Sequence, residues 1–265
     1  MSFSVLMSVY KKENATYLDE CLESLTRQTK QASEIVLVED GEITVELSGV
    51  IEKYLHLLPI KSVVLEKNGG LAAALNAGLK CCSNELVARM DTDDVCLPFR
   101  FERQVAYMLA HPEVSVSSAW IEEKDEQMSE FLFLKKLPST HDDILKFAKK
   151  RNPISHPVSI FRKTAVMSVG AYPEVFPEDY ALWSLMIVNG FKFENIPETL
   201  LYMRTGSNFM GRRGLDFFKG EIGLLKYQRT IGFLSFSEFC RNLLIRSVVR
   251  LAPVKIRTLF YKFAR

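Results

Sequence analysis

Residues 85–94 read Glu-Leu-Val-Ala-Arg-Met-Asp-Thr-Asp-Asp. The largely apolar run over Glu85–Met90 has the length of a strand, and the acidic cluster after it would end that strand. The carboxylates of Asp91, Asp93 and Asp94 repel one another, so the cluster is destabilising unless a cation offsets its charge. Carboxylate oxygens suit Mg²⁺ or Mn²⁺, but an Asp before a helix is also a common capping residue. The stretch predicts a buried strand that ends either in a metal site or in a capping loop.

Strand and helix signals alternate on both sides of this stretch. Apolar runs predict further strands over residues 3–10, 34–39, 61–65, 114–121 and 155–161. Helical spacing and capping residues predict helices over residues 16–29, 45–57, 71–79 and 179–188. This order predicts an α/β fold of the Rossmann-like kind, with a mostly parallel sheet and helices on both faces. Ligands bind such sheets at the carboxyl ends of the strands, which is where the acidic cluster falls.

Cysteine content and hydropathy limit the compartment and the membrane topology. The five cysteines form no C-x-x-C pair, which argues against a disulfide framework and a structural zinc site. Free thiols favour a reduced, cytoplasmic compartment. The apolar residues 3–10 lack a preceding basic region, so they are predicted to form a strand and not a signal peptide. No segment offers about 18 uncharged apolar residues, so we expect no membrane-spanning helix.

The C-terminal residues 239–265 contain seven Lys or Arg and no Asp or Glu, with apolar residues between the cations. Pro253 would divide this segment into two short helical pieces. One interpretation is a peripheral anchor on anionic lipid, and the other is a helical cap whose cations are simply exposed. The same charge would suit nucleic acid, but the chain has no recognition motif, so we expect no nucleic-acid partner.

A second acidic pair, Glu178-Asp179, opens the helix predicted over residues 179–188. At this position the pair would cap the helix and interact favourably with its dipole. Alternatively, a carboxylate at a loop-to-helix junction would act as a general base toward a hydroxyl group. The local sequence favours the capping role and leaves the catalytic role open.

Five short motifs that include both acidic clusters follow one another along the chain. They are Glu39-Asp40-Gly41, Asn68-x-Gly70, Asn76-Ala77-Gly78, Asp91-Thr92-Asp93-Asp94 and Glu178-Asp179-Tyr180-x-Leu182-Trp183. Together with the first strand, this series resembles the family 2 glycosyltransferases, which are inverting enzymes with the A-type nucleotide-sugar-binding fold (GT-A). The resemblance spans residues 3–205 and is strongest to bacterial members that build O-antigen and capsule repeat units.

The resemblance implies a role for particular positions. Nucleotide-sugar binding would fall to Ser8, Tyr10, Asp40, Asn68, Asp91 and Arg204. The family more often has Asp-Asp-Gly-Ser where this chain has Glu39-Asp40-Gly41-Glu42. That departure leaves the identity of the nucleotide base less certain than the binding of a nucleotide.

The resemblance also implies a metal site and a catalytic pair. Asp93 would ligate Mn²⁺ or Mg²⁺, with Asp94 an adjacent candidate. Asp179 would be the general base and Glu178 its neighbour. His156 and Arg162, which flank an apolar run, are possible contacts to the acceptor or the diphosphate.

On this resemblance the chain divides into three parts. Residues 1–110 would form a nucleotide-sugar-binding half, residues 111–215 an acceptor-binding and catalytic-base half of the same domain, and residues 216–265 a helical basic C-terminal region. The implied reaction is inverting transfer of a sugar from a UDP-sugar to a hydroxyl of a polyprenyl-diphosphate-linked saccharide. It would take place at the cytoplasmic face of the membrane, where the basic region would supply peripheral contact.

Two alternatives to this reaction stay open. A sugar nucleotidyltransferase of the same fold would carry a Gly-rich N-terminal loop with Arg or Lys, and Val5–Glu13 contains no Gly or Arg. A non-catalytic, membrane-peripheral protein that binds a nucleotide-sugar would have no need of both Asp93 and Asp179. Assays of donor hydrolysis would separate this second alternative from an enzyme.

Overall fold

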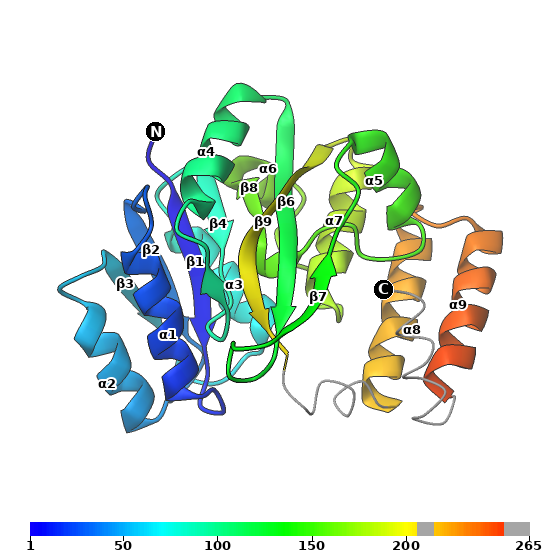
Figure 1. The fold of residues 1–265 in the computed structure, drawn as a ribbon. Coiled ribbons are helices and arrows are strands. Elements are labelled where there is room, and N and C mark those ends of the chain that lie inside the picture. Colours follow the sequence, from blue (N-terminus) through cyan, green and yellow to red (C-terminus); the bar gives the residue numbers. More distant parts are fainter. Residues whose placement is uncertain (206–214, 252–265) are drawn as a thin grey trace.

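The computed structural model describes residues 1–205 and 215–251, which form one sheet with helices on both faces (Figure 1). Neighbouring strands follow the order β3-β2-β1-β4-β8-β6-β9-β5, and β7 also pairs with β6. The strands are β1 (Ser4–Val9), β2 (Glu34–Glu39), β3 (Ile60–Val64), β4 (Leu86–Arg89), β5 (Val95–Cys96), β6 (Val114–Lys124), β7 (Phe131–Lys135), β8 (Ile160–Arg162) and β9 (Lys192–Arg204). The helices are α1 (Ala15–Thr26), α2 (Val45–Tyr54), α3 (Leu71–Cys81), α4 (Arg100–Ala110), α5 (His141–Ala148), α6 (Lys163–Ser168), α7 (Glu178–Val188), α8 (Leu215–Thr230) and α9 (Phe236–Leu251). The predicted α/β fold with a C-terminal helical appendage is confirmed.

The first half of the sheet is parallel, as predicted, because β3, β2, β1 and β4 all run in the same direction. β1 is buried along its whole length, with Val5, Met7 and Val9 in the core shared with α1, α2 and α4. Leu6 faces the opposite core, shared with α3, α6 and α7. Burial on both faces explains why the strand is a continuous apolar run. Gly78 lets α3 approach this face closely, since a Cβ there would lie 2.5 Å from Leu6.

Beyond β4 the sheet is mixed, which the sequence did not predict. β8 runs antiparallel to both β4 and β6, whereas β6 and β9 are parallel. The strand expected over residues 155–161 begins only at Ile160, and a 3₁₀ turn at His156–Val158 precedes it. Pro157 has no N–H to donate to a strand ladder, which accounts for the later start.

The C-terminal helices lie on the side of the molecule opposite β3 and pack against α5 and α7 (Figure 1). Leu225, Phe233 and Leu234 form a small core with Ala148 of α5, and Leu224 packs against Tyr180 of α7. Within the described ranges, no helix has both the length and the apolar character needed to cross a membrane. The predicted break at Pro253 and the cations after it lie outside the described residues.

Candidate active site

A cavity of about 540 Å³ opens at the carboxyl edge of the parallel strands. β1, β2 and β4 end at this edge, because parallel strands present their carboxyl ends on the same side of the sheet. The lining includes six residues that the sequence had marked for donor or metal binding: Ser8, Tyr10, Asp40, Asn68, Asp91 and Asp93. The fold therefore brings together groups that are up to 85 residues apart in the sequence.

Asp40, at the end of β2, organises one wall of the cavity. Its Oδ1 accepts a hydrogen bond from the Gly69 N–H (2.7 Å), and its Oδ2 accepts from the Gly70 N–H (3.0 Å). The Asn68 side-chain amide donates to the same Oδ2 over 2.9 Å. Gly41 has φ +81°, and a Cβ there would lie 2.6 Å from the Asn68 nitrogen, so only glycine fits beside this turn. Asp40 thus fixes the Asn68–Gly70 loop against the cavity.

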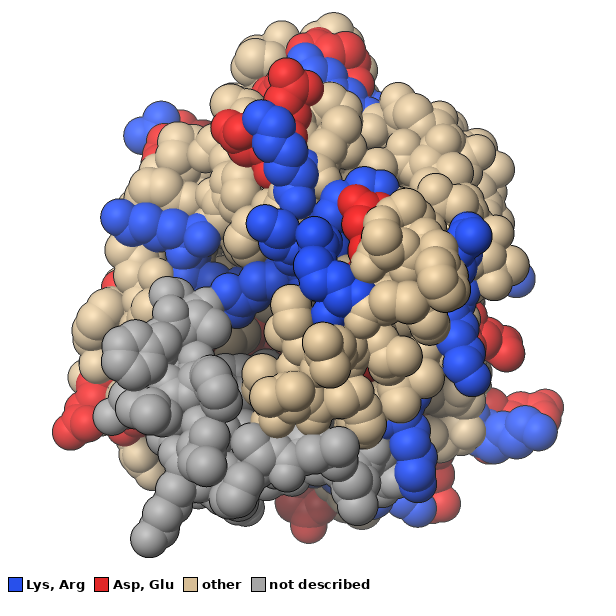
Figure 2. Space-filling model, turned by 90° about the vertical axis from the view of Figure 1, so that its right-hand side faces the viewer, with Lys and Arg blue, Asp and Glu red and all other residues tan. Residues whose placement is uncertain are grey.

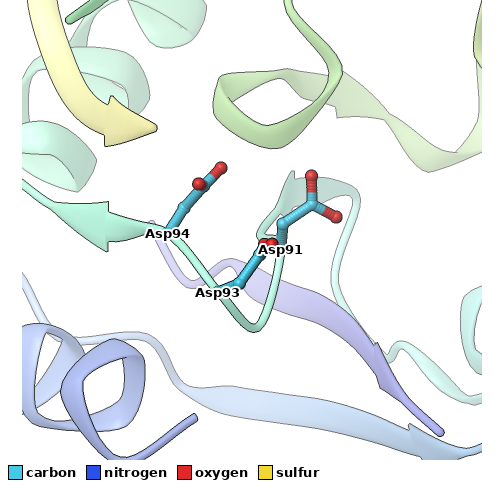
Figure 3. Close-up of side chains that lie close together, drawn as sticks. All are labelled: Asp91, Asp93 and Asp94. Carbon is cyan, nitrogen blue, oxygen red and sulfur yellow. The ribbon is translucent and has the colours of Figure 1, made fainter. Parts of the chain in front are cut away.

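The acidic cluster forms the loop between β4 and β5, from which the side chains of Asp91, Asp93 and Asp94 extend (Figure 3). One carboxylate oxygen from each lies within 4.8 Å of the others. Asp93 is exposed to solvent and lines the cavity, whereas Asp94 is buried and accepts a hydrogen bond from the Arg204 N–H over 2.9 Å. The loop therefore presents Asp91 and Asp93 to the cavity and holds Asp94 beneath it.

The electrostatics of this loop suit a divalent cation. Asp93 is open to the cavity, but the surrounding protein removes much of its hydration, and this loss together with the Asp91 carboxylate raises the pKa of Asp93 to about 6. Burial, followed by the charges of Asp93 and Asp91, raises the pKa of Asp94 well above its ordinary value. A cation among the three carboxylates would relieve this repulsion, and the hard oxygen donors fit Mn²⁺ or Mg²⁺.

Arg204, at the end of β9, supports the acidic loop from below. Its Nε donates to the Asp93 carbonyl oxygen over 3.0 Å, and its guanidinium pairs with Glu20 and lies 4.0 Å from the centre of the Tyr17 ring. The side chain is buried and is absent from the cavity lining. In this structure Arg204 holds the loop in place, and a direct contact to the nucleotide-sugar stays a prediction.

The second acidic pair begins α7. The Asp179 Oδ2 accepts a hydrogen bond from the Asn152 side-chain amide (2.6 Å), and its Oδ1 accepts from the Tyr180 N–H (2.7 Å). Burial raises the pKa of Asp179 above its ordinary value. Burial, and then the charge of Asp179, raises the pKa of Glu178 to about 7. At a pKa near neutrality, Glu178 can take up and release a proton at physiological pH, so the pair as a whole is suited to proton transfer.

Arg89 interacts with both acidic groups. It is the last residue of β4, lines the cavity and forms an ion pair with Asp91. Its positive charge lowers the pKa of Glu178, while the Asp91 carboxylate acts in the opposite direction on Glu178 and on Asp179. The acidic loop and the start of α7 are therefore electrostatically coupled, although Glu178 and Asp179 are not among the residues that line the cavity.

Of the two possible acceptor contacts, Arg162 is placed away from the cavity. It pairs with Leu86 at the start of β4, at the opposite end of the sheet from Asp91. Its guanidinium donates hydrogen bonds to the carbonyl oxygens of Val114 (2.9 Å), Met108 (2.8 Å) and His111 (3.2 Å). Arg162 lies at this end of the sheet because β8 runs antiparallel to β4. A contact between Arg162 and the acceptor or diphosphate stays a prediction.

His156 is nearer to the site but buried in the core. Its Nε2 lies 3.0 Å from the Tyr172 hydroxyl, and its ring packs edge-on against Trp183. Burial, followed by the charge of Arg89, lowers the pKa of His156 well below its ordinary value, so the ring is neutral. The backbone of Tyr172 is in turn held by the Asn76 side chain. His156 therefore belongs to the support beneath Arg89, and a contact to the acceptor stays a prediction.

Three further residues at the site were not marked from the sequence: Arg89, Glu13 and Asn152. A cation inside an otherwise apolar strand was a usable signal for Arg89. Glu13 lines the cavity and accepts a hydrogen bond from the Thr92 hydroxyl, and burial raises its pKa to about 7. Nothing in the local sequence distinguishes Asn152, because only the fold brings it into contact with Asp179.

The parallel sheet, the Asp-x-Asp loop at its carboxyl edge and the facing carboxylate pair define a class, the nucleotide-sugar-binding proteins of the A-type fold. Residues 4–217 match the model for glycosyl transferase family 2, and the chain belongs to that family. The chain is therefore a glycosyltransferase, as the resemblance predicted.

The chain is also similar to individual glycosyltransferases. The "Amylovoran biosynthesis glycosyltransferase AmsE" of Erwinia amylovora is 44% identical over 262 residues, which cover 98% of each chain. The "UDP-Gal:alpha-D-GlcNAc-diphosphoundecaprenol beta-1,3-galactosyltransferase" of Escherichia coli is 38% identical over 262 residues, 98% of this chain and 95% of the relative. Among solved structures, the mannosyltransferase PcManGT of Pyrobaculum calidifontis, in complex with GDP-Man and Mn²⁺, superposes with a TM-score of 0.67 at 13% identity, over 99% of this chain and 79% of that one. This last similarity shows the shared fold.

Proposed function

We propose that the protein transfers a sugar from a UDP-sugar to a hydroxyl of a lipid-diphosphate-linked glycan, with inversion at the anomeric carbon, in the synthesis of a bacterial surface polysaccharide such as O-antigen. The observation that supports the proposal is that Arg89 pairs with Asp91 of the acidic loop and also interacts electrostatically with Glu178 at the start of α7. An inverting transfer needs a departing diphosphate on one side of the sugar and a base-activated hydroxyl on the other. In this proposal the acidic loop serves the diphosphate and the carboxylate pair serves the hydroxyl.

On the donor side, Asp93 and Asp91 are the residues that would hold Mn²⁺ or Mg²⁺. Asp93 is the main ligand in this proposal because it is exposed to the cavity, whereas Asp94 is buried and accepts from the Arg204 N–H. When bound, such an ion supplies Lewis-acid stabilisation of the negative charge that grows on the diphosphate. Asp40 and Asn68 shape the opposite wall, where the nucleotide would bind.

On the acceptor side, Asp179 is the proposed general base. Asn152 and the Tyr180 N–H each bind one of its oxygens, so the carboxylate is held in a fixed orientation. It would remove the proton of the acceptor hydroxyl as that oxygen attacks, and Glu178 would moderate its charge. General-base assistance of this kind is typically worth about 10²- to 10⁴-fold in rate.

The acceptor class rests on the relatives. One acts in amylovoran biosynthesis, and another is named as a galactosyltransferase that uses UDP-Gal and a diphosphoundecaprenol-linked GlcNAc. Near-complete coverage of both chains supports a related acceptor for this protein. The donor is accordingly a UDP-sugar, and the acceptor a saccharide on a polyprenyl diphosphate.

A lipid-linked acceptor places the reaction at a membrane surface, and we propose the cytoplasmic face. The side of the molecule formed by α5, α8 and α9 carries many Lys and Arg side chains (Figure 2). The exposed cations on or beside these helices are Lys146, Lys150, Arg151, Lys219, Lys226, Arg229 and Arg241. Leu244, Ile245 and Val248 of α9 are also exposed, so this helix adds an apolar stripe. Cations beside exposed apolar groups suit peripheral contact with anionic lipid.

Product analysis tests the proposed reaction. The full chain would be incubated with Mn²⁺, UDP-galactose or UDP-N-acetylglucosamine, and an N-acetylglucosaminyl diphosphate that carries a long alkyl chain. We expect a disaccharide product with a β-linkage, because the sugar of these donors is α-linked. An α-linked product would exclude inversion, and donor binding without transfer or hydrolysis would support the non-catalytic alternative. Formation of a nucleotide-sugar from UTP and a sugar phosphate would support a nucleotidyltransferase.

A further inference from the structure

The Arg89 side chain is a buried cation with unused donors. It is only 1% exposed, and its Nη2 forms the ion pair with Asp91. Its Nε and Nη1 are buried and have no hydrogen-bond partner within residues 1–205 and 215–251. Buried polar groups in native proteins are nearly always paired, because an unpaired donor loses its hydration without compensation. Two such donors on one charged group therefore need an explanation.

The position of Arg89 suggests why two of its donors have no partner. The residue lines the same cavity as Asp91 and Asp93 and forms an ion pair with Asp91, and its charge lowers the pKa of Glu178 at the start of α7. Below it, His156 and Tyr172 are already hydrogen-bonded to each other. Because Arg89 lines the cavity, a molecule bound there is the candidate partner for Nε and Nη1.

The reaction geometry identifies what would lie there. In an inverting transfer the sugar lies between the leaving diphosphate and the attacking hydroxyl. With the diphosphate at the acidic loop, the sugar attached to it would lie close to Arg89, which lines the cavity and pairs with Asp91 of that loop. Hydroxyl oxygens of a sugar accept hydrogen bonds, and these donors would give up no water contact in forming them, since both are buried already.

We propose that Arg89 binds the transferred sugar of the donor: Nη2 holds Asp91, while Nε–H and Nη1–H donate hydrogen bonds to sugar oxygens. This inference rests on the sugar transfer proposed above, and it makes Arg89 a determinant of which sugar is accepted. The competing explanation is that Arg89 only offsets the negative charge of Asp91. A lysine would serve that purpose equally well, but it lacks the planar fork of donors.

Two substitutions separate these explanations. Arg89→Lys keeps the positive charge and can still reach Asp91, while Arg89→Met removes both the charge and the donors. Calorimetry would give the affinities of each variant for UDP, UDP-galactose and UDP-N-acetylglucosamine in the presence of Mn²⁺. We expect both variants to lose about 10- to 100-fold in affinity for the UDP-sugar that the wild type binds, and Arg89→Lys, which keeps a cation beside Asp91, to change the UDP affinity by less than about threefold. The control is Arg162→Lys, an arginine at the other end of the sheet, which should leave the ratio of the two affinities unchanged.

Each other outcome counts against the inference. Wild-type affinity for the UDP-sugar in Arg89→Lys would assign Arg89 to charge compensation alone. An equal loss of UDP and UDP-sugar affinity would place its effect on the nucleotide or the fold, and failure of Arg89→Lys to fold would do the same. If the wild type itself binds UDP but no UDP-sugar, the proposed function fails, and the inference falls with it. If Arg89→Met alone fails to fold, the affinities of Arg89→Lys decide between sugar binding and charge compensation.

Discussion

The side-chain amide of Asn152 donates a hydrogen bond to Oδ2 of Asp179, with 2.6 Å between nitrogen and oxygen. Asn152 lies in the segment after α5 and Asp179 in the first turn of α7, so the contact joins two parts of the fold at the proposed base. The Ile154 N–H binds the Asn152 Oδ1 over 3.3 Å, which orients the amide. A base that is held in this way is pre-positioned for the acceptor.

Asn152→Ala should therefore lower the rate of transfer while donor affinity stays the same. We expect a loss of about 10- to 100-fold in kcat, because the carboxylate loses one of its two orienting hydrogen bonds. Steady-state kinetics with UDP calorimetry measures both quantities. Asn189→Ala removes an exposed amide that donates to the Leu185 carbonyl and serves as the control. Equal kinetics of Asn152→Ala and the wild type would show that this hydrogen bond has no part in catalysis.

The acidic loop predicts that UDP binding depends on a divalent cation. Mn²⁺ should raise the UDP affinity of the wild type by about tenfold or more, and Asp93→Asn should abolish this gain. Asp94→Asn should lose less, since an amide oxygen can still accept from the Arg204 N–H. Calorimetry with and without Mn²⁺ measures the effect, and Asp142→Asn on the surface of α5 is the control. An unchanged UDP affinity of the wild type on addition of Mn²⁺ would show that UDP binding does not depend on a divalent cation.

The raised pKa of Glu178 predicts how stability varies with pH. An acid whose pKa rises on folding stabilises the protein most below its unfolded pKa, and this stabilisation is lost as the pH rises through the folded pKa. For Glu178 the window runs from its ordinary value of 4.5 to about 7. Glu178→Gln should therefore raise the free energy of unfolding by about 1–3 kcal/mol more at pH 8 than at pH 4.5.

Urea unfolding at the two pH values measures this difference. Glu174→Gln changes an exposed carboxyl group of the preceding loop and is the matched control. A Glu178→Gln variant whose stability differs from the wild type by the same amount at both pH values would show that Glu178 is not strained by its burial.

Exposed apolar side chains on α9 predict membrane contact. Leu244→Glu with Ile245→Glu should reduce binding to vesicles that contain anionic lipid by about tenfold or more, without loss of stability, because both side chains are exposed. Co-sedimentation at low salt measures the bound fraction, and a chain truncated after Phe236 should behave in the same way. Val45→Glu, at a position 84% exposed on α2, tests whether added negative charge alone has this effect. Equal vesicle binding by the wild type, the double variant, the truncated chain and Val45→Glu would contradict membrane contact through α9.

The first half of the fold could be predicted from the sequence because most of its strands are buried on both faces. Strands such as β1 are covered on both faces, so they are continuous apolar runs with clear ends. β9 is different: Lys192–Arg204 includes charged residues and Pro197, and its pairing with β6 shifts register several times. That strand is formed by its neighbour in the sheet, which no local pattern predicts.

The functional site also combines residues whose convergence the sequence predicts with residues whose position it does not. The motifs at Asp40 and Asp91–Asp94 end predicted strands, so their convergence follows from a parallel sheet. The location of Arg162 away from the cavity lining could not be predicted, because the direction of β8 depends on a pairing with β4 that the sequence does not reveal. The role of Arg89 depends on Glu178, which is 89 residues away and reaches the site only through the fold.

The most direct test of the account is Asp179→Asn. Asn has nearly the same shape and can still cap α7, so a capping role predicts little change. The base role predicts a fall of about two or more orders of magnitude in kcat, at unchanged affinity for the donor. Glu178→Gln, assayed in parallel, should be milder. Near-normal turnover of Asp179→Asn with an inactive Glu178→Gln would reassign the base to Glu178, and near-normal turnover of both would contradict the proposed mechanism.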